Sequence, residues 1–188
     1  MGFYDEEKTA REYIAMAEGY DGSFLIDVMS KHVPEQASVL EIGMGPGTDL
    51  DLLGARYQTT GSDTSSFFLT RYQQLNPTAD LMKLDAVTLE TDRKFDCIYS
   101  NKVLHHLDDN DLASSLQRQK QLLNSGGFVM HSFWSGSGVD EMQGLKFHYH
   151  TEASLRAAFG AQFAVLELAT YKELKQDDSI YVLAQLRD

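Results

Sequence analysis

The chain has 188 residues, 43% of them hydrophobic, and its 28 acidic and 16 basic side chains give a formal net charge of −12. This length supports one substantial core, so we expect a single domain over residues 1–188, and the acidic surface argues against nucleic acid as a substrate or partner. The acidic amino terminus, the lack of a long apolar run and a single cysteine within an apolar segment argue against export and a membrane partner, and favour a cytoplasmic protein.

The amino-terminal part of the chain predicts two helices followed by a strand, a tight turn and a helix. Aromatic and aliphatic residues recur near helical spacing over residues 5–18 and 22–32. After Pro34, the apolar run 38–42 predicts a first strand, and residues 48–55 predict a leucine-bearing helix. Glycines separate this strand from this helix, so the three parts form a strand–loop–helix unit.

The rest of the chain continues the alternation of strands and helices. We expect strands over residues 58–62, 81–84, 95–99, 128–133, 163–169 and 180–186, and helices over 65–75, 109–123 and 151–159. The last two strands are joined by a charged segment too short for a crossover helix, so they must run antiparallel. The pattern predicts an α/β fold, a doubly wound, mostly parallel seven-stranded sheet with helices on both faces and an antiparallel last strand.

The most informative segment is the glycine-rich turn after the first strand, Glu41-Ile42-Gly43-Met44-Gly45-Pro46-Gly47. Glycines let the backbone turn sharply and let a ligand approach it closely, although a plain tight turn needs them too. The spacing is G-x-G-x-G, whereas dinucleotide-binding loops have G-x-G-x-x-G, and the Gly-Lys-Ser/Thr ending of triphosphate-binding loops is missing. An acidic residue two positions before the first glycine favours a cationic ligand such as an ammonium or a sulfonium.

Several segments resemble, in order, the motifs of the class I S-adenosylmethionine-dependent methyltransferases. They are the glycine-rich turn itself, Gly61-Ser62-Asp63-Thr64-Ser65, Leu84-Asp85-Ala86, residues 95–107, residues 122–127 and the closing strand at 178–183. The resemblance implies a Rossmann-like methyltransferase fold that binds S-adenosylmethionine and releases S-adenosylhomocysteine. It also implies that helices within residues 1–33 form a lid over a cofactor-binding core at 37–188.

The resemblance places the cofactor contacts at the carboxyl edge of the sheet. The implied cofactor-binding residues are Tyr13, Glu41, Gly43, Gly45, Gly47, Asp63, Thr64, Asp85, Ala86 and Asn101. Apart from the resemblance, Asp63 lies about 20 residues past the loop at a strand end, where a carboxylate can accept both hydroxyls of a ribose. Simpler roles remain open: Asp63 as a helix cap, Asp85 as a turn former, Asn101 as a cap, and Tyr13, which the resemblance pairs with Tyr4, as a packing residue.

Histidines follow the fourth and fifth strands, where the methyl acceptor would sit. Methyl transfer from a sulfonium mainly needs the partners to be positioned and desolvated, but a general base helps when the acceptor is a hydroxyl or a protonated amine. We predict His106 first and His131 second as catalytic bases, with a structural, hydrogen-bonded histidine as the alternative for each. His148-x-His150 raises the question of a metal, yet no carboxylate pair or cysteine lies at ligand spacing, so no metal is predicted.

These features predict a methyltransferase that acts on a small-molecule acceptor at oxygen, nitrogen or carbon, as a monomer or homodimer. Two other functions remain open. The first is an NAD(P)-dependent oxidoreductase on the same architecture, which the glycine spacing disfavours. The second is a protein that binds the cofactor without turnover.

Overall fold

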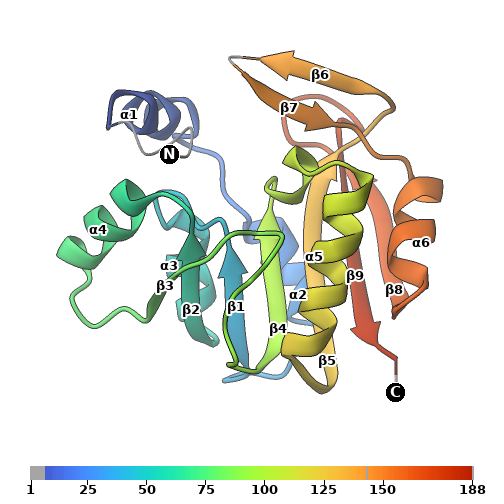
Figure 1. Cartoon of the computed structure of the whole chain (residues 1–188), viewed down its shortest axis with the longest axis horizontal. Coiled ribbons are helices and arrows are strands. Elements are labelled where there is room, and N and C mark those ends of the chain that lie inside the picture. The colour runs from blue at the N-terminus through green and yellow to red at the C-terminus, as the bar shows by residue number, and fades with distance from the viewer. Residues whose placement is uncertain (1–6, 143, 188) are drawn as a thin grey trace.

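A seven-stranded sheet forms the middle layer of the molecule (Figure 1). In a computed structural model that describes residues 7–142 and 144–187, its strands are β1 (Ser38–Ile42), β2 (Gln58–Asp63), β3 (Leu81–Lys83), β4 (Phe95–Asn101), β5 (Leu123–Trp134), β8 (Phe163–Tyr171) and β9 (Ser179–Leu186). Their order across the sheet is β3-β2-β1-β4-β5-β9-β8. Strand β9 runs antiparallel to β5 and β8, and the other neighbours are parallel, which confirms the predicted fold class.

Helices cover both faces of this sheet. They are α1 (Glu7–Met16), α2 (Ser23–Met29), α3 (Thr48–Gly54), α4 (Ser66–Leu75), α5 (Asp109–Leu122) and α6 (Glu152–Gly160). In Figure 1, α5 and α6 lie in front of the strands, and α2 and α3 lie behind them. The helices predicted from residue periodicity are therefore present, although each begins or ends up to a few residues from its predicted bounds.

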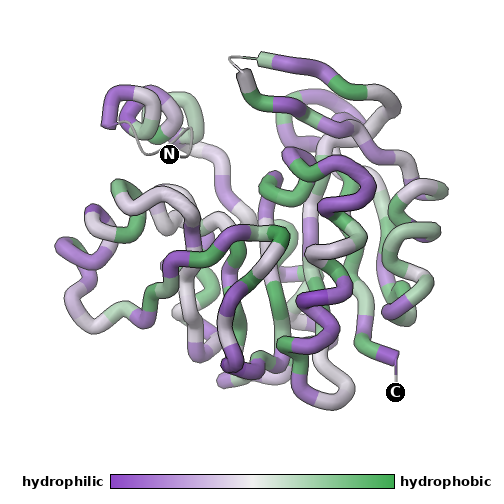
Figure 2. The backbone as a smooth tube through the Cα atoms, viewed as in Figure 1, coloured by the Kyte–Doolittle hydropathy of each residue, from purple (hydrophilic) through white to green (hydrophobic). Residues whose placement is uncertain are grey.

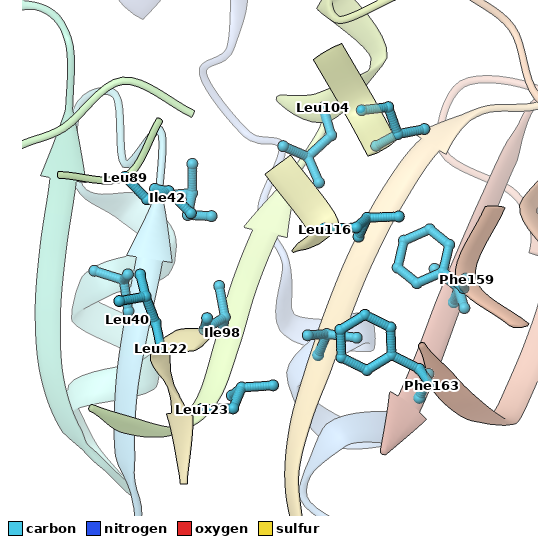
Figure 3. Close-up of a cluster of buried hydrophobic side chains, with 14 of the residues drawn as sticks. Leu40, Ile42, Leu89, Ile98, Leu104, Leu116, Leu122, Leu123, Phe159 and Phe163 are labelled. Atoms are coloured by element: carbon cyan, nitrogen blue, oxygen red, sulfur yellow. The ribbon is translucent and has the colours of Figure 1, made fainter. Parts of the chain in front are cut away.

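Two large hydrophobic cores, and a smaller cluster of Met44, Leu50 and Tyr72, hold the helices to the sheet. One core joins leucines of α5 and the phenylalanine and leucine side chains of α6 to the strands, and Figure 3 shows Leu116, Phe159 and Phe163 packed within it. The other core joins α2 and α3 to the opposite face through residues such as Met29, Leu53 and Tyr99. In Figure 2, hydrophobic segments lie along the central strands, and α5 alternates between hydrophilic and hydrophobic segments.

Side-chain caps fix where several helices begin. Asp108 accepts hydrogen bonds from the backbone N–H groups of Asn110 and Asp111, as expected of the residue that starts α5. Thr151 and Ser154 cap each other's backbone N–H groups at the start of α6. Because a capping side chain satisfies N–H groups that have no partner within the helix, these residues set the loop-to-helix boundaries.

The carboxyl edge of the sheet carries two additional elements. Helix α1 lies above α4, and a hairpin of β6 (Val139–Met142) and β7 (Leu145–His148) lies above β5, both at the top in Figure 1. The sequence pattern predicts no strand over residues 136–150, so this hairpin is found only in the structure. A short 3-10 helix, η2 (Leu104–His106), follows β4 and lies against β7. No helix in the described ranges is long and apolar enough to cross a membrane.

Candidate functional site

The glycine-rich turn after β1 has a backbone conformation that requires glycine. Gly43, Gly45 and Gly47 have φ values of +69°, +50° and +93°, a region that residues with a side chain rarely adopt. A Cβ on Gly43 would lie 2.6 Å from Val103 Cγ2, and one on Gly47 would lie 2.2 Å from Tyr72 Cε2. Neighbouring side chains therefore pack directly against the backbone of the turn, which keeps its shape fixed.

Asp63, at the end of β2, holds this turn in place. Its Oδ2 accepts a hydrogen bond of 2.9 Å from the N–H of Gly45, and its Oδ1 accepts one of 2.8 Å from the N–H of Ser65. The cap of α4 is the side chain of Ser65, which accepts from the N–H of Phe68, so Asp63 is not the helix cap. The structure thus brings Asp63 to the glycine turn, with the exposed Thr64 beside it.

Glu41 carries a buried carboxylate beneath the turn. The residue is 3% exposed, and its Oε2 has no hydrogen-bond partner among the residues that the structure describes. Burial raises the pKa of this carboxyl well above its usual value. The negative charges of Asp49, Asp63 and Asp51 raise it further. An acceptor oxygen buried without a donor is costly, so this position is suited to a ligand that brings a donor or a positive charge.

Asp49 is a second buried carboxylate, which the sequence analysis did not single out. It lies in the first turn of α3 and accepts hydrogen bonds from the N–H of Gly22 at 2.7 Å, the hydroxyl of Tyr99 at 2.8 Å and Nδ2 of Asn101 at 3.1 Å. Burial raises the pKa of Asp49, and these donors partly oppose that shift. Asn101 also accepts from Ser132 at 2.5 Å, so it joins β4, β5 and α3.

The other predicted cofactor residues lie at the same edge of the sheet. Asp85 is exposed, and its Oδ1 accepts from the N–H groups of Val87 and Thr88, which is the turn-forming role left open by the sequence. The neighbouring Ala86 is half-buried. Tyr13 of α1 lies over the turn, with its Cε1 3.5 Å from the position of a Cβ on Gly45. Tyr4 lies outside the described residues.

Two adjacent histidines follow β4 and meet the hairpin. The Nε2 atoms of His105 and His106 are 3.1 Å apart, and Nδ1 of His106 lies 2.8 Å from the carbonyl oxygen of Lys146. The His105 ring stacks on Phe147, with centroids 5.3 Å apart, and lies 6.4 Å from Trp134. Burial lowers the pKa of both histidines, and that of His105 lies well below its usual value. His106 therefore lies where an acceptor was expected.

His131, predicted as the second catalytic base, lies in the core. It is fully buried, and its ring nitrogens hydrogen-bond Ser100 at 2.8 Å and Gln119 at 2.8 Å. Burial lowers its pKa to about 3. The predicted catalytic role is corrected on these grounds, because the side chain points towards α5 and has no free nitrogen for an acceptor. The alternative of a structural, hydrogen-bonded histidine fits the structure.

A half-buried lysine, Lys102, which the sequence did not indicate, lies beside the histidines. Nζ of Lys102 is 4.1 Å from the centroid of the Trp134 ring, donates to Ser179 at 2.9 Å and pairs with the carboxylate of Glu173. Burial lowers the pKa of Lys102, and the charge of Glu173 opposes the shift. The ammonium group is thus neutralised by its partner rather than left for a ligand.

No cluster of three or more metal-ligating side chains is found in the described part of the chain. Two shallow surface hollows lie away from the carboxyl edge, one against α5 and one between α4 and β3. Their linings contain none of the predicted site residues. Glu41, Asp49, His105 and His106, whose pKa values are perturbed, lie instead at the carboxyl edge, where ligands bind in open α/β sheets.

Several solved structures with the same fold are methyltransferases. The 1,6-didemethyltoxoflavin-N1-methyltransferase of Burkholderia thailandensis, with bound 1,6-didemethyltoxoflavin and S-adenosylhomocysteine, is 17% identical, with a TM-score of 0.80 over 95% of this chain and 87% of that one. An S-adenosylmethionine-dependent methyltransferase of Clostridium acetobutylicum is 14% identical, with a TM-score of 0.77 over 94% of this chain and 98% of that one. At these identities the similarity establishes the fold.

Sequence comparisons point to the same family. A trans-aconitate 2-methyltransferase of Methylobacterium radiotolerans is 35% identical over 93 residues, which are 48% of this chain but only 35% of that relative's length. The family model of a methyltransferase domain matches residues 17–166, which include the glycine turn, the carboxylates around it and both histidines after β4. The resemblance inferred from the motifs is thereby confirmed, and the chain belongs to this methyltransferase domain family.

Proposed function

We propose that this protein transfers a methyl group from S-adenosylmethionine to a small-molecule acceptor. The observation that carries the proposal is the buried Oε2 of Glu41, which has no partner in the described residues and lies beneath a turn in which Gly43 and Gly47 leave no room for side chains. A ligand with a positive charge and hydrogen-bond donors suits such a position, and a dinucleotide pyrophosphate does not. The bound cofactor supplies an electrophilic methyl group on a good leaving group.

The chain's own residues bind and orient the two partners. We assign cofactor contacts to the predicted set, namely Tyr13, Glu41, Gly43, Gly45, Gly47, Asp63, Thr64, Asp85, Ala86 and Asn101. Residues 37–188 form the cofactor-binding core and residues 1–33 the lid, a division supported by the contact between Tyr13 of α1 and the glycine turn. The acceptor lies at the β4–β5 end, beside His106, as predicted from the sequence.

The alternatives receive no comparable support. The family match and the neighbours described above do not favour an NAD(P)-dependent oxidoreductase. A protein that binds the cofactor without turnover would have the same carboxylates around the glycine turn. Only detection of a methylated product excludes such a protein. The cytoplasmic location and the monomeric or homodimeric state stay predictions from the sequence.

Calorimetric titration with S-adenosylhomocysteine, NAD and NADP tests the proposal directly. We expect saturable binding of S-adenosylhomocysteine alone. Asp63→Ala should weaken that binding by roughly 1–3 kcal/mol, because it removes a hydrogen-bond acceptor from the site and from the glycine turn. Asp92→Ala, which removes an exposed carboxylate elsewhere on the chain, is the matched control and should bind as the wild type does. Binding of a nicotinamide dinucleotide in place of S-adenosylhomocysteine would overturn the proposal.

A further inference from the structure

The hydrogen bonds of the two adjacent histidines determine which nitrogen holds each proton. The carbonyl oxygen of Lys146 can only accept, so Nδ1 of His106, 2.8 Å away, must carry a hydrogen. In the neutral ring, Nε2 of His106 is then an acceptor. The 3.1 Å contact between the two Nε2 atoms therefore requires His105 to donate from its Nε2.

After this assignment, one ring nitrogen of the two histidines has a lone pair with no hydrogen-bond donor. Because His105 donates from Nε2, its Nδ1 is an acceptor, and this atom is buried with no hydrogen-bond partner within residues 7–142 and 144–187. His105 itself is 2% exposed, beside Trp134 and stacked on Phe147. A buried acceptor that lacks a donor indicates a missing partner, and the partner must bring an O–H or N–H.

The surroundings of His105 also constrain the charge of that partner. Burial and the neighbouring positive and titratable groups lower the pKa of His105, and burial lowers the pKa of His106 and His150 as well, so these imidazoles are neutral near pH 7. The nearby ammonium of Lys102 is already paired with Glu173. These residues therefore provide no unpaired positive charge that could bind a carboxylate at this position.

We propose that the methyl acceptor is a neutral molecule with an O–H or N–H at the attacked atom, that His105 Nδ1 receives this proton, and that His106 is a positioning residue that fixes the tautomer of His105. This inference rests on the proposed function and deepens it. It also moves the catalytic base from His106, the choice made from the sequence, to its neighbour. A carboxylate acceptor, which is already ionised, would need no such base.

The proposed methyl transfer conserves atoms and charge. The acceptor heteroatom forms a bond to the methyl carbon, and the bond between that carbon and sulfur breaks with its electron pair remaining on sulfur. The proton of the acceptor moves to His105 Nδ1, so the positive charge passes from the sulfonium to an imidazolium. The Nε2–H of His105 shares this charge with His106, whose own Nδ1–H stays on the Lys146 carbonyl.

Imidazole nitrogen NMR on the full-length chain labelled with ¹⁵N-histidine tests the assignment without any turnover. We expect a proton on Nδ1 of His106 and on Nε2 of His105. His106→Gln should keep the His105 tautomer, because the amide oxygen of the glutamine can accept from the Nε2–H of His105. In His106→Asn the side chain is too short to make this hydrogen bond, so the tautomer of His105 should no longer be fixed. His32→Gln, which replaces a histidine that pairs with Glu167 on another part of the molecule, is the control. A proton on Nδ1 of His105 in the wild type would overturn the proposal.

A matched pair of probes tests the acceptor class. With S-adenosylhomocysteine bound, 2-naphthol should shift the His105 Nδ1 resonance towards that of a hydrogen-bonded nitrogen, and 2-naphthoate at the same concentration should not. No shift with 2-naphthol, or an equal shift with both, would contradict the proposal. Because binding of S-adenosylhomocysteine is measured first by calorimetry, failure of the proposed function is distinguished from failure of this inference alone.

Turnover with S-adenosylmethionine and 2-naphthol gives the kinetic counterpart. His105→Gln should lower kcat about 100-fold, the size usual for loss of a general base, with little change in the KM for the cofactor. His106→Asn should approach that loss, and His106→Gln should retain most of the activity. Equal losses for the two His106 variants would show that His106 does not act by fixing the tautomer.

Discussion

The site has a carboxylate end, with Glu41, Asp49 and Asp63, and an imidazole end, with His105 and His106. The side chains at the two ends are acids and bases respectively, but burial favours the neutral form of both. At the β1–β2 end, burial raises the pKa of Glu41 and of Asp49. At the β4–β5 end, burial lowers the pKa of His105 and of His106. Each shift favours the neutral form, so the folded site carries less charge than its residues suggest, and the cofactor introduces the main positive charge.

The two ends differ in how their shape is maintained. At the carboxylate end, Asp63 and side chains such as Tyr72 pack against a backbone with no room for a Cβ. At the imidazole end, the hairpin contributes Phe147 and the Lys146 carbonyl from a separate two-stranded sheet. We therefore expect the carboxylate end to be rigid and the imidazole end to open more easily, as suits the entry of an acceptor.

The largest effect is expected for Gly47→Ala. The new Cβ would combine a φ of +93° with a 2.2 Å approach to the Tyr72 ring, so backbone strain and steric overlap add. We expect the free energy of unfolding to fall by about 3 kcal/mol or more, with loss of S-adenosylhomocysteine binding. Chemical denaturation followed by circular dichroism, together with calorimetry, measures both.

Gly138→Ala, near the hairpin, is the matched control for this substitution. Gly138 has a φ of +95°, but a Cβ there would meet nothing within 4 Å, so only the backbone strain of about 1–2 kcal/mol remains. Equal losses for the two variants would show that the carboxylate end is no more tightly packed than the hairpin, and the contrast in rigidity would be lost.

The carboxylate end could be predicted from the sequence, because its parts are local. The strand over residues 38–42 has the predicted bounds, and the glycines follow this apolar strand directly. Asp63 ends the next strand, which is polar and was predicted from its neighbours and its threonines. Asp49 was missed because its donors, Gly22 and Tyr99, lie 27 and 50 residues away in the sequence. Nothing in a single sequence pairs such distant groups.

The imidazole end was harder to predict for a different reason. Strand β5 is buried on both faces, so its residues do not alternate between polar and apolar, and the sequence does not show which side chains reach the edge. His131 was therefore predicted at the site although it lies in the core. The hairpin that positions Lys146 and Phe147 also escaped prediction, because strands of four residues are too short to show a clear hydrophobic pattern.

His131 gives the next largest effect, through the pH dependence of stability. Its pKa is lowered to about 3 in the folded state, so between that value and the unfolded value of about 6.5 the unfolded chain binds the additional proton. Stability is therefore lost as the pH falls below about 6.5, by about 2 kcal/mol at pH 5. The difference in unfolding free energy between the wild type and His131→Asn should shrink by this amount from pH 7.5 to pH 5. A constant difference would mean that the pKa of His131 is the same in the folded and the unfolded chain.

Glu41→Gln should separate stability from binding. The raised pKa of Glu41 means that folding favours its protonated form, so stability is lost as the pH rises above about 4.5, and the neutral amide avoids this loss. At pH 7.5 we expect the free energy of unfolding to increase by about 1 kcal/mol while S-adenosylhomocysteine binds about tenfold more weakly. Glu90→Gln, at an exposed position, should change neither quantity. If Glu41→Gln binds S-adenosylhomocysteine as tightly as the wild type, the Glu41 carboxylate does not contact the cofactor.

The smallest effect on global stability is expected for Phe147→Ala. The ring is half-buried and contacts His105 and His106, but it belongs to neither of the two main cores. The free energy of unfolding should therefore fall by less than about 1 kcal/mol, whereas amide hydrogens of the hairpin, such as that of Tyr149, should exchange much faster. S-adenosylhomocysteine binding should stay unchanged, since the carboxylate end is untouched. A loss of 3 kcal/mol or more would instead make the hairpin part of the cooperative fold, and an acceptor would then have to enter without moving it.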